Sequence, residues 1–200
     1  MSFYSGCKFV LAGLIRRLWR IKTVGKENEC EGKAYLICAN HQSMLDCVLL
    51  GAAIKNNPKY MAKAELLKVP VVGGLVKALG AYPVDRGGSD VAAIKKTIAL
   101  LKEGNCVTMF PQGTRYKGVD PKTTKVKYGC AMIAKRADVP VLPVFIQVKD
   151  HKVKLFRRTT VIIGKEISPE TLRSVMTSDE DYKSSAEYIF SKITELEGQV

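Results

Sequence analysis

The sequence predicts an α/β fold: a single domain with a mixed, largely parallel central sheet flanked by helices, plus an N-terminal amphipathic helix. Two observations lead to this prediction. From residue 34 onward, short apolar runs alternate with amphipathic segments, which is typical of strands and helices in turn. A chain of 200 residues with 46% hydrophobic residues can bury one core but is short for two ordinary domains. We therefore expect an N-terminal membrane-associating segment over residues 1–30 and an α/β domain over residues 31–200.

The N-terminal segment has the pattern of an amphipathic helix. Its apolar residues recur at helical spacing: Phe3, Cys7, Val10, Leu11, Leu14, Leu18 and Ile21. The apolar run 9–15 is too short to span a bilayer, and no small-residue cleavage site follows it. Such a helix, with Trp19 at its basic end, either lies in the headgroup layer of a membrane or packs on the domain. The segment alone favours neither.

The remaining elements follow from the alternation of patterns. Strands are expected at 34–39, 58–62, 81–84, 106–110, 141–148 and 160–163. Helices are expected at 43–54, 71–79, 90–102, 128–137, 169–175 and 179–196. The helix 90–102 is the clearest, because Ser89 can cap its start, apolar residues line one face, and Gly104 ends it.

The charge of the chain predicts an anionic partner. Lys and Arg number 32 against 19 Asp and Glu, which gives a net charge of +13 and a pI near 9.5. Such a surface suits an anionic bilayer, a phosphorylated or acidic substrate, or nucleic acid. Because the basic residues are spread along the chain without a reading motif, we expect no nucleic-acid partner.

Disulfides and a metal site are not expected. The six cysteines form no CxxC pair and lie mostly in apolar runs, which is typical of buried thiols in a reducing compartment. They are Cys7, Cys30, Cys38, Cys47, Cys106 and Cys130. The chain has two histidines, His41 and His151, and no cluster of His, Cys and acidic residues surrounds either in the sequence.

His41 and Asp46 are candidates for a catalytic pair. His41 follows the expected strand 34–39, and loops at the carboxyl ends of strands commonly carry catalytic residues in α/β proteins. On one helix, five positions would separate the two side chains by about 140°, so they meet only if His41 precedes the helix and Asp46 begins it. The carboxylate would then orient the imidazole as a proton acceptor. Taken alone, the spacing is better explained by a surface or capping histidine and a carboxylate at a helix start.

A second candidate loop follows the expected strand 106–110. Gly113 permits a close approach of the backbone, Thr114 offers a hydroxyl, and Arg115 offers a planar guanidinium that binds phosphate through two hydrogen bonds. Taken alone, this run is also compatible with a turn that carries a solvated arginine.

Together the two motifs resemble two signature blocks of the glycerolipid acyltransferase family, and within it the 1-acylglycerol-3-phosphate acyltransferases. Asn40-His41-x4-Asp46 resembles the first block, and Phe110-Pro111-x-Gly113-Thr114-Arg115 resembles the third. The second and fourth blocks are resembled by Lys63-x2-Leu66-x6-Gly73-x12-Arg86 and by Val139-Pro140-Val141-Leu142-Pro143-Val144. The four blocks stand in the family's order and cover roughly residues 34 to 148.

The resemblance implies acyl transfer from a thioester, acyl-CoA or acyl carrier protein, to the sn-2 hydroxyl of 1-acyl-glycerol-3-phosphate. The product would be phosphatidic acid, in phospholipid biosynthesis. His41 would be the base and Asp46 would orient it, with no metal or resident cofactor. The substrate-binding residues would be Lys63, Arg86, Gln112, Gly113, Thr114 and Arg115.

Gln112 departs from the family pattern, which usually has Glu at this position. A carboxylate that only accepts hydrogen bonds has become a neutral amide that also donates. We expect a tolerated variant that leaves the acceptor open. The alternatives are acylation of glycerol-3-phosphate or another lysophospholipid, or a catalytically weakened peripheral lipid-binding protein.

The lipid substrate also sets the expected location. We expect a peripheral or monotopic protein on the cytoplasmic face of a membrane. Its partners would be anionic lipid, a lysophospholipid acceptor and the acyl donor, all of which suit the positive charge.

Overall fold

The computed structural model describes residues 3–63, 66–70, 73–74, 77, 80–84, 90–178 and 181–199. These residues form a seven-stranded sheet with the order β1-β7-β6-β2-β5-β3-β4. The strands are β1 (Lys22–Val24), β2 (Leu36–Ala39), β3 (Lys59–Lys63), β4 (Ala81–Val84), β5 (Val107–Met109), β6 (Val141–Val148) and β7 (Thr159–Ile163). Neighbouring strands are parallel except for β6 and β7, so the predicted mixed, largely parallel sheet is confirmed.

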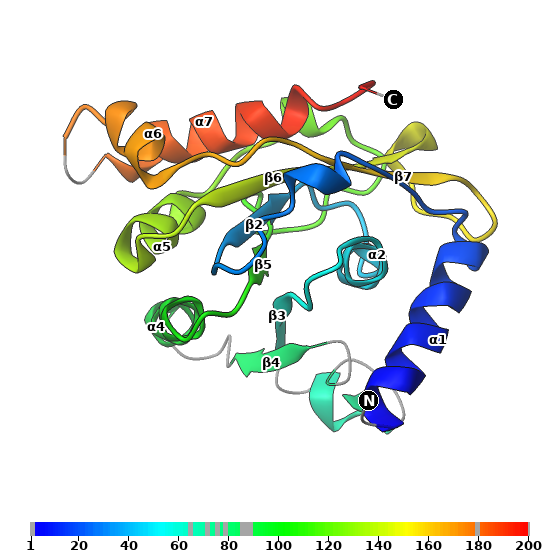
Figure 1. The fold of residues 1–200 in the computed structure, drawn as a ribbon. Coiled ribbons are helices and arrows are strands. Elements are labelled where there is room, and N and C mark those ends of the chain that lie inside the picture. Colours follow the sequence, from blue (N-terminus) through cyan, green and yellow to red (C-terminus); the bar gives the residue numbers. More distant parts are fainter. Residues whose placement is uncertain are drawn as a thin grey trace.

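Helices cover both faces of the sheet (Figure 1). The α-helices are α1 (Phe3–Leu18), α2 (Asp46–Ala53), α4 (Asp90–Lys102), α5 (Gly129–Ala137), α6 (Pro169–Ser174) and α7 (Tyr182–Thr194). Short 3-10 turns are η1 (Lys26–Asn28), η2 (Leu66–Lys68), η3 (Pro121–Thr123) and η4 (Lys149–His151). Helices α1 and α2 lie on one side of the sheet, and α4 and α5 lie on the other (Figure 1).

The strand β2 illustrates how the core is built. Leu36 and Cys38 pack with buried residues of α5 and α7, whereas Ile37 and Ala39 pack with buried residues of α2. Successive side chains of a strand point to opposite faces, so a sheet covered on both sides requires apolar residues at every position. This is why β2 reads as a continuous apolar run, and why its polar continuation begins only where the strand ends.

The sequence located six of the seven strands but not β1. β1 is only three residues long and contains Lys22 and Thr23, so it gives no apolar run from which to predict a strand. Its pairing partner β7 lies more than a hundred residues away in the sequence. Most of the expected helix 71–79 and the expected cap Ser89 lie outside the described residues.

The N-terminal segment packs on the rest of the protein. Ile15 of α1 is buried in the core beside α2, and the Arg16 Nε donates a hydrogen bond of 2.6 Å to the carbonyl of Ala52. β1 then joins the sheet, so the described part of residues 1–30 folds together with the domain. Among the described helices, none has the length and apolar character needed to cross a bilayer. Membrane association of this segment stays a prediction.

Candidate active site

His41 and Asp46 lie in contact at the carboxyl edge of the sheet. His41 is in the loop that leaves β2, and Asp46 is the first residue of α2. The His41 Nδ1 is 2.8 Å from the Asp46 Oδ2. The Asp46 side chain is fully buried, whereas 16% of the His41 side chain is exposed. The structure therefore has the loop-then-helix arrangement that the spacing required for the two side chains to meet.

The Asp46 carboxylate fixes the orientation of the imidazole. Besides His41, its Oδ2 accepts hydrogen bonds from the backbone N–H groups of Gln42 at 2.7 Å and Ser43 at 2.8 Å. These donors hold the carboxylate at the start of α2. Because a carboxylate only accepts hydrogen bonds, the His41 Nδ1 carries the hydrogen and Nε2 is left with a free lone pair.

Phe110 fixes the plane of the His41 ring from one side. The two rings are stacked with their centroids 3.9 Å apart and an angle of 12° between their planes. Phe110 follows β5, which pairs in parallel with β2, so the two strands end at the same edge of the sheet. The stacking restricts rotation of the imidazole and keeps Nε2 directed away from Asp46.

Two polar side chains that flank His41 anchor its loop to β6. The buried Asn40 accepts a 2.7 Å hydrogen bond from the backbone N–H of Ile146 and donates one of 3.2 Å to the carbonyl of the same residue. The Gln42 amide donates to that carbonyl at 2.7 Å. Sequence reasoning assigned no role to these two residues. Their position on either side of a histidine, between an apolar strand and a helix, was the available signal.

Gln112 lies behind His41 and supports its backbone. Its Oε1 accepts a 2.6 Å hydrogen bond from the His41 N–H, and its Nε2 donates at 2.7 Å to the Thr124 hydroxyl. The side chain is buried, with 2% of its surface exposed. The sequence suggested that Gln112 binds substrate, whereas in the structure both ends of its amide are used within the protein. Gln112 therefore positions the His41 loop, and a direct contact with substrate stays a prediction.

We expect Gln112→Glu to lower the free energy of unfolding by about 1–3 kcal/mol, because it buries a charge and loses a donor. The Thr124 hydroxyl already donates to the Pro121 carbonyl at 2.6 Å, so it cannot also donate to a carboxylate at position 112. Urea denaturation measures the change. The matched control is Thr124→Ser, which keeps the hydroxyl. A Gln112→Glu variant as stable as the original chain would contradict this account.

Gly113, Thr114 and Arg115 border the same cavity as His41. This cavity has a volume of about 200 Å³ and is further lined by Cys47, Tyr60, Met61, Thr108, Met109 and Phe110. Gly113 adopts a φ of 67°, a left-handed conformation that favours glycine, and a Cβ at this position would have to displace the Lys127 side chain, which would lie 2.7 Å away. Arg115 is exposed, which leaves its guanidinium available to an anion at the cavity.

The other two predicted cationic ligands cannot be placed in full. Arg86 lies outside the described residues. Lys63 is the last residue of β3, whose carboxyl end lies at the same edge as that of β2, but its side chain also lies outside the described part. Their roles stay predictions.

Cys47 lines the cavity but is not an activated nucleophile. Burial, together with the nearby Asp46 carboxylate, raises the pKa of the Cys47 thiol to about 12. A thiol with this pKa stays protonated near neutral pH, and the thiolate is the reactive form of cysteine. In the part of the chain that the structure describes, no group of three or more His, Cys, Asp and Glu residues is arranged to hold a metal ion.

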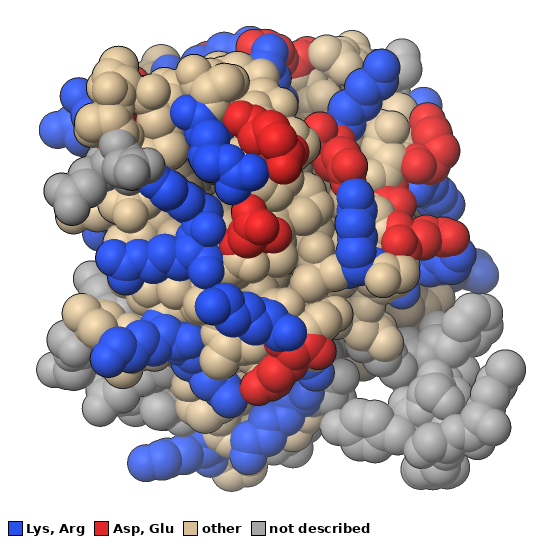
Figure 2. All heavy atoms as spheres, turned by 60° about the vertical axis from the view of Figure 1, so that its left-hand side comes forward, with Lys and Arg blue, Asp and Glu red and all other residues tan. Residues whose placement is uncertain are grey.

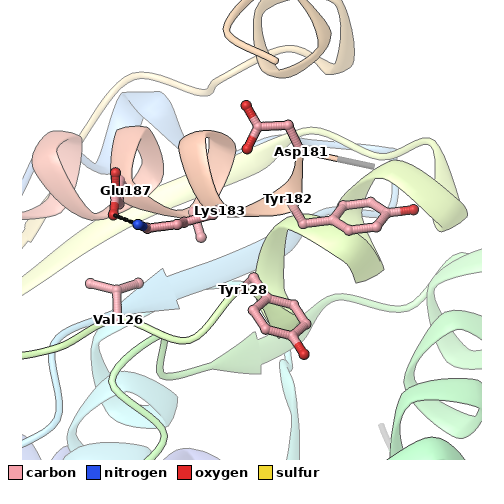
Figure 3. Close-up of a pocket in the computed structure, with 7 residues that line it drawn as sticks. Val126, Tyr128, Asp181, Tyr182, Lys183 and Glu187 are labelled. Atoms are coloured by element: carbon pink, nitrogen blue, oxygen red, sulfur yellow. Dashed lines mark ion pairs between the residues drawn. The ribbon is translucent and has the colours of Figure 1, made fainter. Parts of the chain in front are cut away.

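A second hollow, of about 390 Å³, lies between α7 and the loop before α5 (Figure 3). Val126 and Tyr128 line it from the loop, and Asp181, Tyr182, Lys183, Ala186 and Glu187 line it from the α7 side. Lys183 extends along the helix toward Glu187, to which it is paired at 3.9 Å (Figure 3). His41 does not line this second hollow, so the cavity at His41 is the better candidate for the reaction site.

Comparisons with known proteins identify the family to which this chain belongs. The profile of the acyltransferase family matches residues 20–147. The 1-acyl-sn-glycerol-3-phosphate acyltransferase of Bacillus subtilis is 30% identical, and the alignment covers 98% of both chains. The Streptococcus pneumoniae protein of the same name is 37% identical over 55% of this chain and 40% of its own length.

Solved structures include a similar fold. The crystal structure of the 1-acyl-sn-glycerophosphate acyltransferase PlsC from Thermotoga maritima matches with a TM-score of 0.71 and 25% sequence identity. The superposition covers 99% of this chain and 84% of that protein.

Proposed function

Because this chain belongs to the acyltransferase family, we propose that it transfers a fatty-acyl group from a thioester donor to the sn-2 hydroxyl of 1-acyl-glycerol-3-phosphate, forming phosphatidic acid. The observation that carries the proposal is the imidazole of His41, which is oriented by Asp46 and borders a cavity that also contains Arg115. A base and an anion-binding cation around one cavity match an acceptor that carries both a hydroxyl and a phosphate.

The reaction proceeds by direct transfer. The His41 Nε2 takes the proton of the acceptor hydroxyl while its oxygen attacks the thioester carbonyl carbon. The resulting tetrahedral intermediate collapses with cleavage of the C–S bond, and the leaving thiolate takes up the proton from the imidazolium. His41 is regenerated, and no acyl-enzyme forms. This agrees with the protonated state of Cys47, the thiol that lines the cavity.

Asp46 assists by stabilising the charge that develops on His41. Its carboxylate is 2.8 Å from Nδ1 and fully buried, where an ion pair is weakly screened by solvent. The two backbone donors from Gln42 and Ser43 hold this carboxylate in place, so no rearrangement is needed when the imidazole becomes positive.

The acceptor phosphate is bound by cations at the edge of the cavity. We assign this role to Arg115, which lines the cavity, and to Arg86 and Lys63 from the order of the sequence motifs. Gly113 and Thr114 complete the loop that approaches the phosphate. The acyl donor is acyl-CoA or acyl carrier protein, and no resident cofactor is required because the thioester supplies an activated acyl group.

A panel of acceptors and donors tests the proposal. Purified protein is incubated with lysophosphatidic acid, glycerol-3-phosphate or lysophosphatidylcholine, each with acyl-CoA and with acyl carrier protein thioester, and products are identified by mass spectrometry. We expect phosphatidic acid from the first acceptor. Turnover of only another acceptor would replace the substrate, whereas lipid binding without turnover on any acceptor would overturn the enzymatic proposal.

We expect Arg115→Ala to raise the KM for lysophosphatidic acid about tenfold or more and to change kcat less, because the contact is remote from the reacting carbonyl. Arg115→Lys keeps the charge but loses the two-point hydrogen bonding, so we expect an intermediate KM. Steady-state kinetics with a saturating acyl donor measures both. An unchanged KM in the alanine variant would exclude Arg115 as a phosphate ligand.

The location follows from the substrate. We propose a peripheral or monotopic membrane protein because its acceptor and product are membrane lipids, and the cytoplasmic face because the pattern of its cysteines is typical of a reducing compartment. The net charge of +13 supports attraction to anionic lipid, and this attraction weakens as salt is added.

A further inference from the structure

Exposed apolar side chains gather in the loops at the catalytic edge of the sheet. Strands β2 to β6 run parallel to one another, so the segments that follow them all emerge at the edge that carries His41. Large exposed apolar residues lie in these segments: Met44 after β2, Val69 after β3, Val119 and Tyr128 after β5, and Leu155 and Phe156 after β6.

The loop between β6 and β7, residues 149–158, combines this apolar character with strong positive charge. Leu155 and Phe156, its adjacent apolar residues, are 49% and 65% exposed. Its charged residues are Lys149, Asp150, Lys152, Lys154, Arg157 and Arg158. Asp150 lies 3.9 Å from Arg157, so one cation is partly balanced. On the helix-covered face in Figure 2, by contrast, red acidic side chains are interspersed among the blue basic ones.

The backbone holds Phe156 in an outward position. Its φ of 60° lies in the left-handed region, which a bulky side chain rarely adopts and which costs conformational energy. The Phe156 N–H donates a 2.8 Å hydrogen bond to the carbonyl of Leu18 at the end of α1, and the Thr159 N–H donates to Trp19 at 3.1 Å. The loop is thus attached to the basic end of α1, beside Arg17 and Arg20.

The same loop is connected to the candidate active site. The Gly118 N–H donates a 2.9 Å hydrogen bond to the carbonyl of His151, and the Tyr116 N–H donates one of 2.9 Å to the carbonyl of His41. Residues 116–118 directly follow Arg115 and are thus hydrogen-bonded both to the His41 backbone and to the loop 149–158. A ligand that positions residues 149–158 therefore also positions this segment.

We propose that residues 149–158 form a membrane anchor, in which Leu155 and Phe156 enter the interface of an anionic bilayer and the flanking cations meet lipid headgroups. An apolar tip with cationic flanks fits the boundary between headgroups and acyl chains. An acidic acyl carrier protein would satisfy the cations, but the exposed Leu155 and Phe156 require an apolar partner, which favours the bilayer. The anchor rests on the proposed function, since it presents the His41 cavity to an acceptor that resides in the membrane.

Vesicle binding tests the anchor directly. The full chain and the double variant Leu155→Ser/Phe156→Ser are co-sedimented with vesicles of phosphatidylcholine and phosphatidylglycerol. We expect the double variant to bind the vesicles at least about tenfold more weakly, because it lacks the apolar side chains that enter the bilayer. The matched control is Val91→Ser, an exposed apolar residue of α4 that lies outside residues 149–158, with an expected change below about twofold. Circular dichroism checks that each variant is folded.

A charge-reversal variant provides an independent measurement. Lys152→Glu/Lys154→Glu keeps Leu155 and Phe156, and we expect it to bind anionic vesicles more weakly but neutral phosphatidylcholine vesicles unchanged. The anchor would be overturned if the serine double variant bound anionic vesicles as well as the original chain does. It would also be overturned if the double variant lost binding to acyl carrier protein and kept binding to vesicles.

Activity assays separate a failure of the anchor from a failure of the proposed function. With a short-chain lysophosphatidic acid kept as monomers, the serine double variant should turn over like the original chain, whereas with vesicle-embedded acceptor its rate should fall. If the original chain turns over no acceptor, the proposed function fails, and vesicle binding still decides the anchor.

Discussion

Replacing His41 by alanine is expected to lower kcat about 10³-fold to 10⁴-fold and to leave the protein folded, because the variant lacks the base that accepts the hydroxyl proton. The residual rate would come from bringing the acceptor and the thioester together. The backbone bonds of His41, from its N–H to Gln112 and from its carbonyl to Tyr116, do not depend on the side chain. We therefore expect the variant to fold, with a modest decrease in thermal stability from the lost stacking on Phe110 and the lost hydrogen bond to the buried Asp46 carboxylate.

Conversion of lysophosphatidic acid to phosphatidic acid, followed by mass spectrometry, measures this effect, and thermal unfolding provides the check on folding. His151→Ala is the matched control, assayed with short-chain lysophosphatidic acid kept as monomers, since His151 does not line the cavity and its bond to Gly118 is made by the backbone carbonyl. Full activity of His41→Ala would show that another group takes the proton, and the catalytic assignment would be abandoned. A variant that fails to unfold cooperatively would be replaced by His41→Gln.

Replacing Asp46 by asparagine is expected to lower kcat about 10²-fold to 10⁴-fold and also to reduce the free energy of unfolding by about 1–3 kcal/mol. The variant keeps the side-chain volume but loses the charge that stabilises the protonated imidazole. One oxygen can still accept from His41 and from the two backbone N–H groups. The amide NH₂ then takes the place of the Asp46 Oδ1, a buried atom with no hydrogen-bond partner among the described residues, where its hydrogens would be unsatisfied.

Replacement of Asp46 should lower both activity and stability, whereas replacement of His41 should affect activity far more than stability. Kinetics and urea denaturation on the same preparation measure both quantities. Ser43→Ala is the matched control, because it keeps the backbone N–H that donates to Asp46 and removes only the hydroxyl that accepts from Leu45. Wild-type kcat in Asp46→Asn would mean that the carboxylate serves only to begin α2.

Local patterns in the sequence were sufficient for most of the fold. The helix expected at 90–102 and the strand expected at 141–148 have these same bounds in the structure. The helix is defined by its apolar periodicity and by Gly104 after its end, and the strand by a nearly continuous apolar run. β1 was missed because Lys22 and Thr23 carry no apolar signal, and its position depends on pairing with β7. Some residues of the site were likewise predicted from the sequence and others were not. The contact between His41 and Asp46 was expected from their spacing together with the resemblance to the family motifs. The roles of Asn40 and Gln42 instead depend on Ile146, more than a hundred positions away.

Gln112, the residue that departs from the family pattern, shows which features could be predicted from the sequence and which required the tertiary structure. By itself the sequence determined the α/β class, the pairing of a histidine with an aspartate at the start of a helix, and a glycine-containing loop that ends in an arginine. Only the tertiary structure decided that Gln112 is turned inward, between the His41 backbone and Thr124, and that Leu155 and Phe156 lie at the catalytic edge. The physical reason is that hydrogen-bond direction and exposure depend on neighbours from distant strands, which no local pattern records.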